Sequence, residues 1–166
     1  NAYYLPAARS GILQTHKALT SALVEQAPLA GIKPLQIPAM TGVVADFLKH
    51  LLTLGHREFL FGPHFELPGS TREPRRAVQS VAKFLEEQVS QGSIEVEFPT
   101  GPSHYPEFHY RQNRKRFTLQ RTSSMVSEIA PIVLFLKYKV CPRDLIIIEE
   151  PEAHLHPDNQ RKVARA

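Results

Sequence analysis

Residues 145–157 read Leu-Ile-Ile-Ile-Glu-Glu-Pro-Glu-Ala-His-Leu-His-Pro. Four aliphatic residues run directly into two carboxylates and a proline. An apolar run this rich in β-branched side chains predicts a strand buried on both faces, as at the centre of an α/β sheet. Pro151 has no N–H group to donate, so we expect the strand to end before it. Glu149 and Glu150 then lie at the carboxyl edge of the sheet, where open α/β sheets bind their ligands.

Two adjacent acids at the end of a strand are suited to different tasks, because neighbouring side chains point to opposite sides. One can face a metal ion that carries phosphates, and the other can face an attacking water molecule. P-loop ATPases divide these tasks between two acids at the end of their Walker B strand. Glu149 and Glu150 also fit a buried strand whose polar end simply reaches solvent, and the pattern alone leaves both interpretations open.

The composition is that of an ordinary globular protein. The 166 residues are 42% hydrophobic and 22% charged, which fits one domain or a piece of a larger one. The single cysteine, Cys141, excludes an internal disulfide framework and suits a reducing cytosol. No signal peptide opens the chain, and no apolar run approaches the roughly 18 residues of a membrane span, so we expect a cytoplasmic protein without membrane contact. The net charge of +4 permits contact with a polyanion without requiring it.

The rest of the chain divides into a mainly helical segment of unassigned role, residues 1–92, and a mixed segment, residues 93–166. Asn1-Ala2 resemble an expression scar and are given no weight. We expect helices over residues 10–26, 41–54, 72–91 and 124–138 and from Pro157 onward. Residues 28–38 and 56–70 are expected to be irregular. Residues 93–98 alternate as a strand with one solvated face, and 106–112 with 116–121 predict a hairpin. The expected fold class is α/β, one incomplete domain in which a helical insert and an antiparallel β-meander join the strand at 145–148.

A second informative stretch runs from Arg121 to Glu128, where a cluster of hydroxyl groups meets the first turn of a helix. Helix amino termini carry unpaired N–H groups and a partial positive charge, so such a turn can seat an anion. Ser123 or Ser124 adds a hydroxyl donor. The alternative is ordinary capping of the helix by one of these serines. The residues alone leave both interpretations open.

The two stretches together resemble the second half of an ABC-type ATPase head. The resemblance rests on Ser-Ser, an apolar helix, a hydrophobic strand, Glu-Glu-Pro-Glu-Ala-His-Leu-His-Pro and a polar helix, over about residues 118–166. The likeness is strongest to the branch of P-loop ATPases that contains the overcoming-lysogenisation-defect (OLD) proteins, RecF-like repair ATPases and their AAA relatives. Tyr-Leu-Pro-Ala-Ala-Arg-Ser-Gly at residues 4–11 is also similar to that branch, whereas residues 30–115 match no family that we can name.

The resemblance implies a partial P-loop NTPase fold with ATP and Mg²⁺ as ligands. Glu149 stands where these ATPases organise the magnesium ion, and Glu150 stands where their general base polarises water. Ser123 and Ser124 fall where the signature motif puts a serine on the γ-phosphate of ATP held by a partner head. The D-loop, which crosses the interface between two heads, corresponds to Ala153, His154, Leu155 and His156.

Two departures from the family pattern bear on these roles. Glu149 replaces the usual Asp and adds a methylene group to the reach toward the metal. Met125 and Val126 replace glycines of the usual signature, which hinders close approach of the backbone to phosphate.

The chain contains no Gly-x-x-x-x-Gly-Lys-[Ser/Thr] loop, which cradles phosphates in these ATPases. We therefore expect an internal or carboxyl-proximal part of an ATPase head, with the Walker A loop encoded upstream, and no ATP turnover by the chain alone. In the complete protein, the resemblance implies a homodimer of heads. It also implies a role in DNA repair or phage defence, with DNA or a nuclease as a further partner.

Basic residues cluster on the predicted hairpin: Arg111, Arg114, Lys115 and Arg116. Together with nearby aromatic side chains they predict contact with a nucleic-acid backbone. A solvated hairpin that uses its charges to protect an exposed sheet edge is the other interpretation. Two alternatives to an ATPase part therefore remain. One is a non-catalytic docking or nucleic-acid-binding module, and the other is a metal-dependent hydrolase built on Glu149, Glu150, Glu152, His154 and His156.

Overall fold

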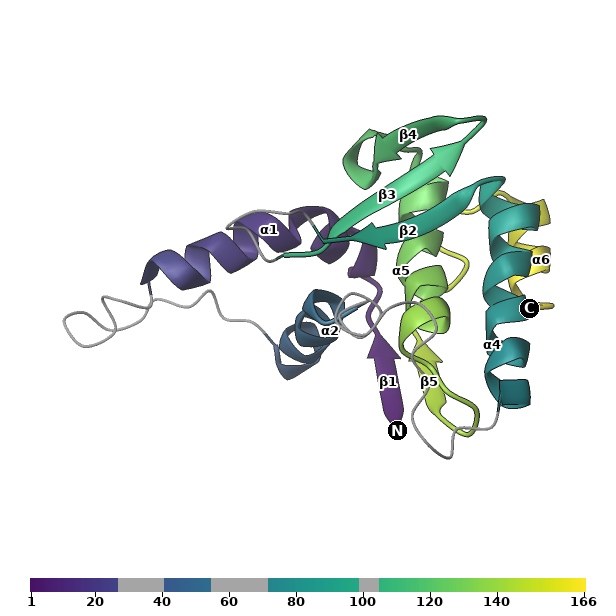
Figure 1. Cartoon of the computed structure of the whole chain (residues 1–166), viewed down its shortest axis with the longest axis horizontal. Coiled ribbons are helices and arrows are strands. Elements are labelled where there is room, and N and C mark those ends of the chain that lie inside the picture. The colour runs from purple at the N-terminus through teal and green to yellow at the C-terminus, as the bar shows by residue number, and fades with distance from the viewer. Residues whose placement is uncertain (27–40, 55–71, 99–104) are drawn as a thin grey trace.

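Figure 1 shows the computed structural model of the chain, which describes residues 1–26, 41–54, 72–98 and 105–166. The irregular links predicted at 28–38 and 56–70 lie outside these residues. The described elements follow in the order β1 (Ala2–Leu5), α1 (Arg9–Gln26), α2 (Gly42–Leu52), α4 (Arg72–Leu85), π-helix η2 (Glu86–Ser90), β2 (Ser93–Glu97), β3 (Glu107–Gln112), β4 (Lys115–Thr118), 3-10 turn η3 (Leu119–Arg121), α5 (Ser124–Tyr138), β5 (Leu145–Ile148) and α6 (Pro157–Val163). None of the described helices is long and apolar enough to cross a membrane.

Helix α5 forms the centre of the core. Every residue from Val126 to Leu136 is buried, as expected of a helix that is apolar around most of its circumference. It lies beside α4 and also contacts α1 and β2 (Figure 1). The ring of Phe135 stacks on Phe47 of α2, with centroids 5.4 Å apart and planes inclined by 9°. The helix predicted at 124–138 is therefore confirmed, together with its burial.

The three other predicted helices of the amino-terminal segment correspond to α1, α2, and α4 continued by η2. Helix α2 begins after Thr41, whose hydroxyl oxygen accepts a hydrogen bond from Val44 N. The α4–η2 helix ends at Gln91, which has a left-handed φ of 54°. A Cβ atom on the next residue, Gly92, would lie 2.5 Å from the ring of Tyr110. The chain therefore enters β2 at a point where only glycine fits.

Strands β2, β3 and β4 form the predicted antiparallel meander, in that order. The β3–β4 hairpin turns through Asn113 and Arg114, which have φ values of 48° and 63°. Positive φ at both positions is the turn geometry whose twist matches a two-residue hairpin. The strand predicted to reach residue 121 ends at Thr118 instead. Leu119 is buried, and both the N–H and the hydroxyl group of Thr122 donate to its carbonyl oxygen, which closes a 3-10 turn.

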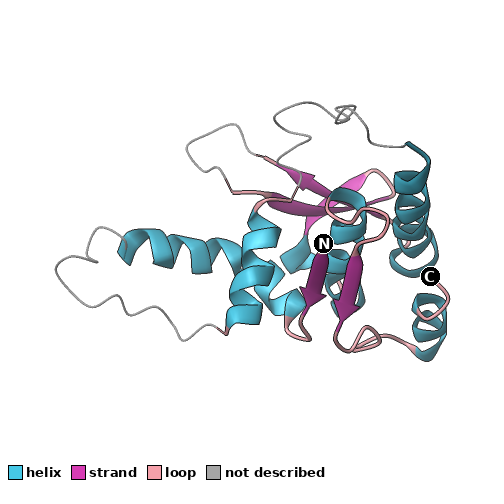
Figure 2. Ribbon diagram, turned by 90° about the horizontal axis from the view of Figure 1, so that it is seen from below, coloured by secondary structure: helices cyan, strands magenta, loops and turns pink. Residues whose placement is uncertain are grey.

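A second sheet pairs β1 with β5 in parallel (Figure 2), with Leu5 opposite Ile148. Strand β1 was not expected from the sequence. The short strand forms because its tyrosine and leucine side chains reach the core: Tyr3 and Leu5 are buried. The pairing brings the amino-terminal residues of the described chain beside the acid-ended strand.

The prediction that the strand at 145–148 is buried on both faces is wrong for the described part of the chain. Ile146 and Ile148 pack against the core, whereas Leu145 and Ile147 are 57% and 46% exposed. Alternate residues of a strand point to opposite faces. One face of β5 therefore packs inward and the other reaches the surface. Among the described strands, only β1 pairs with β5.

Candidate functional site

Glu149 and Glu150 directly follow β5, at the edge where the parallel strand β1 also ends. Glu149 N donates to the carbonyl oxygen of Leu5 at 2.9 Å, so the ladder continues one residue beyond the strand. Both glutamate side chains are exposed. The structure thus places the two acids at the carboxyl edge of a parallel sheet, as the sequence predicts.

The Glu149 carboxylate accepts a hydrogen bond at each of its oxygen atoms. The Tyr4 hydroxyl group donates to Oε1, and Ala7 N donates to Oε2 at 2.9 Å. The bond from Tyr4, and then the bond from Ala7, lower the pKa of Glu149. Glu149 is therefore ionised and oriented. Each oxygen keeps a further lone pair, and a fixed, exposed carboxylate is the kind of ligand that Mg²⁺ takes from a protein, together with water and substrate phosphates.

Glu150 adopts a left-handed backbone conformation, with a φ of 43°. That region is unfavourable for residues with a Cβ atom, and Pro151 restricts the preceding residue further. Such a conformation costs on the order of 1 kcal/mol or more and persists only where the surroundings hold it. The chain therefore turns sharply at Glu150, in a geometry that other groups must maintain.

The guanidinium group of Arg9 contacts the backbone carbonyl groups of this turn. Arg9 stands at the start of α1 and is completely buried. Its Nη1 donates to the carbonyl oxygen of Glu149 at 2.5 Å, and its Nη2 donates to that of Glu150 at 3.0 Å. Burial lowers the pKa of Arg9, and nearby carboxylates, that of Glu128 first, act in the opposite direction. A buried cation therefore donates hydrogen bonds to the backbone of the acid pair.

Glu128 of α5 supplies the counter-charge to Arg9. Nη2 of Arg9 lies 3.4 Å from Oε2 of Glu128, and Nε donates to the Glu128 carbonyl oxygen at 3.3 Å. The hydroxyl group of Ser10 donates to Oε1 of Glu128 at 2.5 Å. Glu128 lies one helical turn after Ser124, on the same side of α5. Through Arg9, the acid pair is therefore connected to the amino-terminal turns of α5.

Ser123 and Ser124 occupy different positions at the start of α5. Ser123 is the capping residue: its hydroxyl oxygen accepts a hydrogen bond from Val126 N at 3.4 Å. Ser124 is the first helical residue and is exposed. The structure thus assigns the capping role to Ser123 and leaves the hydroxyl group of Ser124 at the surface, beside the helix amino terminus.

The segment after Glu150 folds back against the start of α5. Ala153 N donates to the carbonyl oxygen of Glu150 at 3.0 Å, which closes a turn. Leu155 is buried, and His156 caps α6 by accepting a hydrogen bond from Asp158 N at Nδ1. On α6, Asn159 Nδ2 donates to Sδ of Met125 at 2.9 Å. The helix that follows the acid-containing stretch is therefore in contact with the start of α5.

A family model described as an AAA ATPase domain matches residues 39–166. The chain belongs to the AAA ATPase domain family. The matched residues include α5 and the acid pair, whereas β1 and α1 precede them. An ATPase-type function with nucleotide binding follows from this membership. No match was found among curated proteins or among solved structures.

The alternative of a metal-dependent hydrolase has no support in the part of the AAA ATPase domain that the structure describes. Within that part, no group of three or more His, Cys, Asp or Glu side chains is arranged to hold a metal ion. Glu152, His154 and His156, which the alternative requires, are exposed. Magnesium that arrives with ATP needs only one or two protein carboxylates, so the candidate role of Glu149 does not depend on such a cluster.

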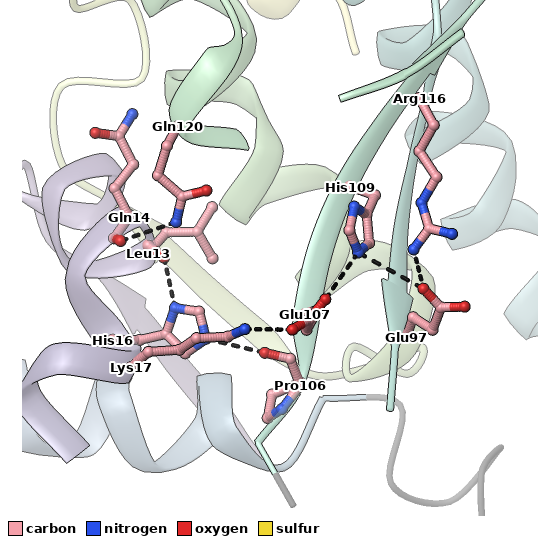
Figure 3. A network of polar contacts seen from close by, with 10 residues as sticks. All are labelled: Leu13, Gln14, His16, Lys17, Glu97, Pro106, Glu107, His109, Arg116 and Gln120. Carbon is pink, nitrogen blue, oxygen red and sulfur yellow. Dashed lines mark hydrogen bonds and ion pairs between the residues drawn. The ribbon is translucent and has the colours of Figure 1, made fainter. Parts of the chain in front are cut away.

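The basic residues of the β3–β4 hairpin are partly neutralised by the neighbouring strand β2. Arg111 pairs with Glu95, with Nη2 and Oε2 3.5 Å apart, and Arg116 pairs with Glu97. Figure 3 shows that Arg116 ends a row of polar contacts that runs from Lys17 through Glu107, His109 and Glu97. Arg114 and Lys115 are exposed at the turn. Contact of the hairpin with nucleic acid remains a prediction, and these two residues are its best candidates.

Sequence reasoning missed Tyr4 and Arg9 as members of the site. One signal for Arg9 was present. A cation in the first turn of a helix is opposed by the helix dipole, so an arginine there indicates a specific acceptor elsewhere. For Tyr4 the only signal was the resemblance of residues 4–11 to the OLD and RecF-like branch, because its role depends on the unpredicted pairing of β1 with β5.

Proposed function

We propose that the chain is the part of an ABC/OLD-type ATPase head that activates water for the hydrolysis of ATP. The observation that supports this most is the acid pair at the edge of the parallel sheet. Glu149 is ionised and fixed by Tyr4 and Ala7, and Glu150 is exposed on a turn whose backbone is held. Membership of the AAA ATPase family supports ATP as the substrate.

In the proposed reaction Glu150 is the general base. Its carboxylate accepts a proton from a water molecule as the oxygen of that water attacks the γ-phosphorus of ATP, and the bond from the γ-phosphorus to the bridging oxygen of ADP breaks. Glu149 would hold the magnesium ion, which when bound would neutralise charge on the phosphates of ATP. The hydrogen bonds to Glu149 support this division, because they keep one acid ionised as a ligand while Glu150 stays exposed to water.

We propose that two heads form a homodimer with ATP between them. The exposed Ser124 then contacts the γ-phosphate of ATP held by the partner head, helped by the free N–H groups of the α5 amino terminus. The exposed His154, in the proposed D-loop, lies at the same interface. This arrangement is supported by the contact between α6, which follows the proposed D-loop, and the start of α5 through Asn159 and Met125.

The phosphate-binding loop is proposed to come from residues outside this sequence, which contains no Walker A motif. The exposed side chains of Leu145 and Ile147 support that proposal. Strands of parallel sheets are usually covered on both faces, so this apolar face of β5 suits contact with the remainder of the head. Because the sequence contains no Walker A motif, we expect that the chain alone turns over no ATP.

The event that hydrolysis drives is proposed from the family resemblance to be DNA repair or phage defence, with DNA or a nuclease as partner. For DNA, the exposed residues Arg114 and Lys115 are the proposed contacts. Replacing both by Ala in the complete protein should then reduce the slope of log affinity for DNA against log salt by about 2. Replacing Arg111 and Arg116, which are paired with glutamates, should leave it nearly unchanged. Equal effects of the two double variants would contradict this assignment.

The deciding experiment is steady-state ATP hydrolysis by the complete ATPase, wild type against Glu150→Gln, over a range of protein concentrations. We expect specific activity that rises with concentration, as a dimeric site requires, and a loss of at least about 100-fold in the variant, because the general base is removed. Nucleotide binding should persist in the variant. A protein that binds nucleotide without hydrolysing it would favour the docking-module alternative.

A further inference from the structure

We propose that Arg9 is a positioning residue that sets the direction of the Glu150 side chain and fixes it relative to the amino-terminal end of α5; this inference rests on the proposed function of Glu150 as general base. Arg9 precedes the residues matched by the family model, and its guanidinium group is buried beneath the acid pair.

The first argument comes from which oxygen atoms Arg9 contacts. The carbonyl group of Glu149 belongs to the peptide plane before the Glu150 Cα atom, and the carbonyl group of Glu150 belongs to the plane after it. Arg9 donates to both oxygens, from Nη1 and Nη2. Because a guanidinium group is planar and its N–H groups diverge at fixed angles, this double contact fixes the two planes relative to each other. Those planes define φ and ψ of Glu150, and so the direction of its side chain.

The second argument is that Glu150 needs such a constraint. Its φ of 43° is unfavourable for a residue with a side chain, and a proline follows it. Without a group that holds both carbonyl oxygens, the residue would relax to an extended conformation and its carboxylate would point elsewhere. A general base must lie within hydrogen-bond reach of its water. The contact from Arg9 is therefore suited to maintaining a strained but productive geometry.

The third argument is the anchor of Arg9 on α5. Nε donates to the carbonyl oxygen of Glu128, and Nη2 pairs with Oε2 of the same residue. Pro131 lies within α5 and has no N–H to donate to the carbonyl oxygen of Ser127. The contact with Arg9 is therefore made beside an interruption in the helical hydrogen bonding. One guanidinium group thus spans the turn of the proposed base and the helix whose first residue, Ser124, is the proposed contact to the partner's ATP.

Burial makes this arrangement costly to disturb. Oε2 of Glu128 is buried and has no hydrogen-bond partner among the described residues, so Arg9 is its nearby compensating charge. Breaking a buried pair from one side leaves the other charge uncompensated. A lysine at position 9 keeps a positive charge near Glu128. Its single ammonium group lacks the planar pair of donors that spans the carbonyl oxygens of Glu149 and Glu150.

The test is Arg9→Lys in the complete ATPase, compared with wild type and Glu150→Gln, with kcat and KM for ATP and thermal unfolding measured on each. We expect kcat to fall by about 10- to 100-fold, as a small misplacement of a catalytic group does, while KM for ATP changes by less than about threefold. Lys137→Met is the matched control. It removes a partly buried ion pair with Glu86 and a bond to the carbonyl oxygen of Ile94, at the far end of α5, and should leave kcat near the wild-type value.

The outcomes separate this inference from the function on which it rests. A wild-type protein that hydrolyses no ATP overturns the proposed function and this inference with it. A wild type that is active, a Glu150→Gln variant that is inactive and an Arg9→Lys variant with unchanged kcat overturn the positioning role alone. A loss of activity shared in proportion by Lys137→Met would show a general effect of destabilisation and also overturn it. If Arg9→Lys does not fold, Glu128→Gln replaces it, with a lower kcat at unchanged KM expected and an unchanged kcat contradicting the proposal.

Discussion

The Tyr4 hydroxyl group donates a hydrogen bond to Oε1 of Glu149, from the strand parallel to the one that the acid follows. Ala7 N donates to the other oxygen, so the carboxylate is fixed from both sides. Groups that orient a metal-binding carboxylate in this way affect metal affinity without contacting the metal. This relationship makes β1 part of the proposed site as well as part of the sheet.

The first prediction concerns the effect of Tyr4 on magnesium. In Tyr4→Phe, we expect the Mg²⁺ concentration for half-maximal ATP hydrolysis to rise about tenfold, because Glu149 loses one of its two orienting bonds. Activity at saturating Mg²⁺ should remain close to wild type. Tyr110→Phe is the control, since it removes a hydroxyl group that donates to the carbonyl oxygen of Ser90, outside the site. Identical magnesium dependence in wild type and Tyr4→Phe would show that Glu149 is not fixed by this bond or does not hold the ion.

The second prediction tests whether Ser124 acts across a dimer. If each site combines Glu150 of one head with Ser124 of the other, Glu150→Gln and Ser124→Ala homodimers should both be nearly inactive. A mixed dimer of the two variants contains one site with both native residues. An exchanged equimolar mixture should therefore regain about a quarter of wild-type activity, as expected for a two-fold symmetric dimer. A mixture as inactive as its two components would place Glu150 and Ser124 in the same head's site, whereas a Ser124→Ala homodimer with wild-type activity would remove Ser124 from the reaction.

The sequence predicted those features that depend on local pattern. The apolar character of α5 and the change to strand periodicity in the meander can be recognised from consecutive residues of the sequence, and the structure confirms both. The position of Glu149 and Glu150 follows from where β5 ends. Each of these predictions needed only the order of residues within one short stretch.

The features that the sequence did not reveal depend on contacts between distant residues. Arg9 and the carbonyl oxygens that it contacts are 140 and 141 positions apart, and β1 exists as a strand through its pairing with β5. The exposed face of β5 was missed for the same reason. Composition shows that Leu145 and Ile147 are apolar, but only the three-dimensional arrangement shows which elements cover them.

The third prediction concerns the junction between η2 and β2. Gly92→Ala should lower the free energy of unfolding by about 1–3 kcal/mol, the usual range for overpacking. The new Cβ atom would lie 2.5 Å from the ring of Tyr110 and 2.6 Å from the carbonyl oxygen of Arg111. Gly11→Ala is the matched control, because no atom of the described part of the chain that could crowd a Cβ atom there lies within 4 Å of it. In α1 that change should increase stability by up to about 1 kcal/mol. Urea unfolding measures the free energy of unfolding of both variants. Equal changes in the two variants would contradict the close approach at Gly92.

The fourth prediction concerns the pH dependence of the ion pair between Lys17 and Glu107. The hydrogen bond from Lys17 is the main cause that lowers the pKa of Glu107 below its ordinary value of 4.5. A carboxyl group whose pKa is lower in the folded state stabilises the protein above the unfolded pKa. That contribution is lost as the pH falls through the lowered pKa of the folded state. The pair is therefore stabilising at neutral pH and ineffective in acid.

Lys17→Met should accordingly reduce stability at pH 7 and progressively less below about pH 4.5. Lys17 and Glu107 are 45% and 34% exposed, so solvent screening limits the expected difference at pH 7 to about 0.2–1 kcal/mol. The control is Lys83→Met, whose partner Glu87 is on the same exposed helix face, with both side chains more than half exposed. Urea unfolding at a series of pH values measures the free energy of unfolding of the wild type and both variants. A difference between wild type and Lys17→Met that grows on acidification would contradict the prediction, because its sign requires that the ionised Glu107 is the form that Lys17 stabilises.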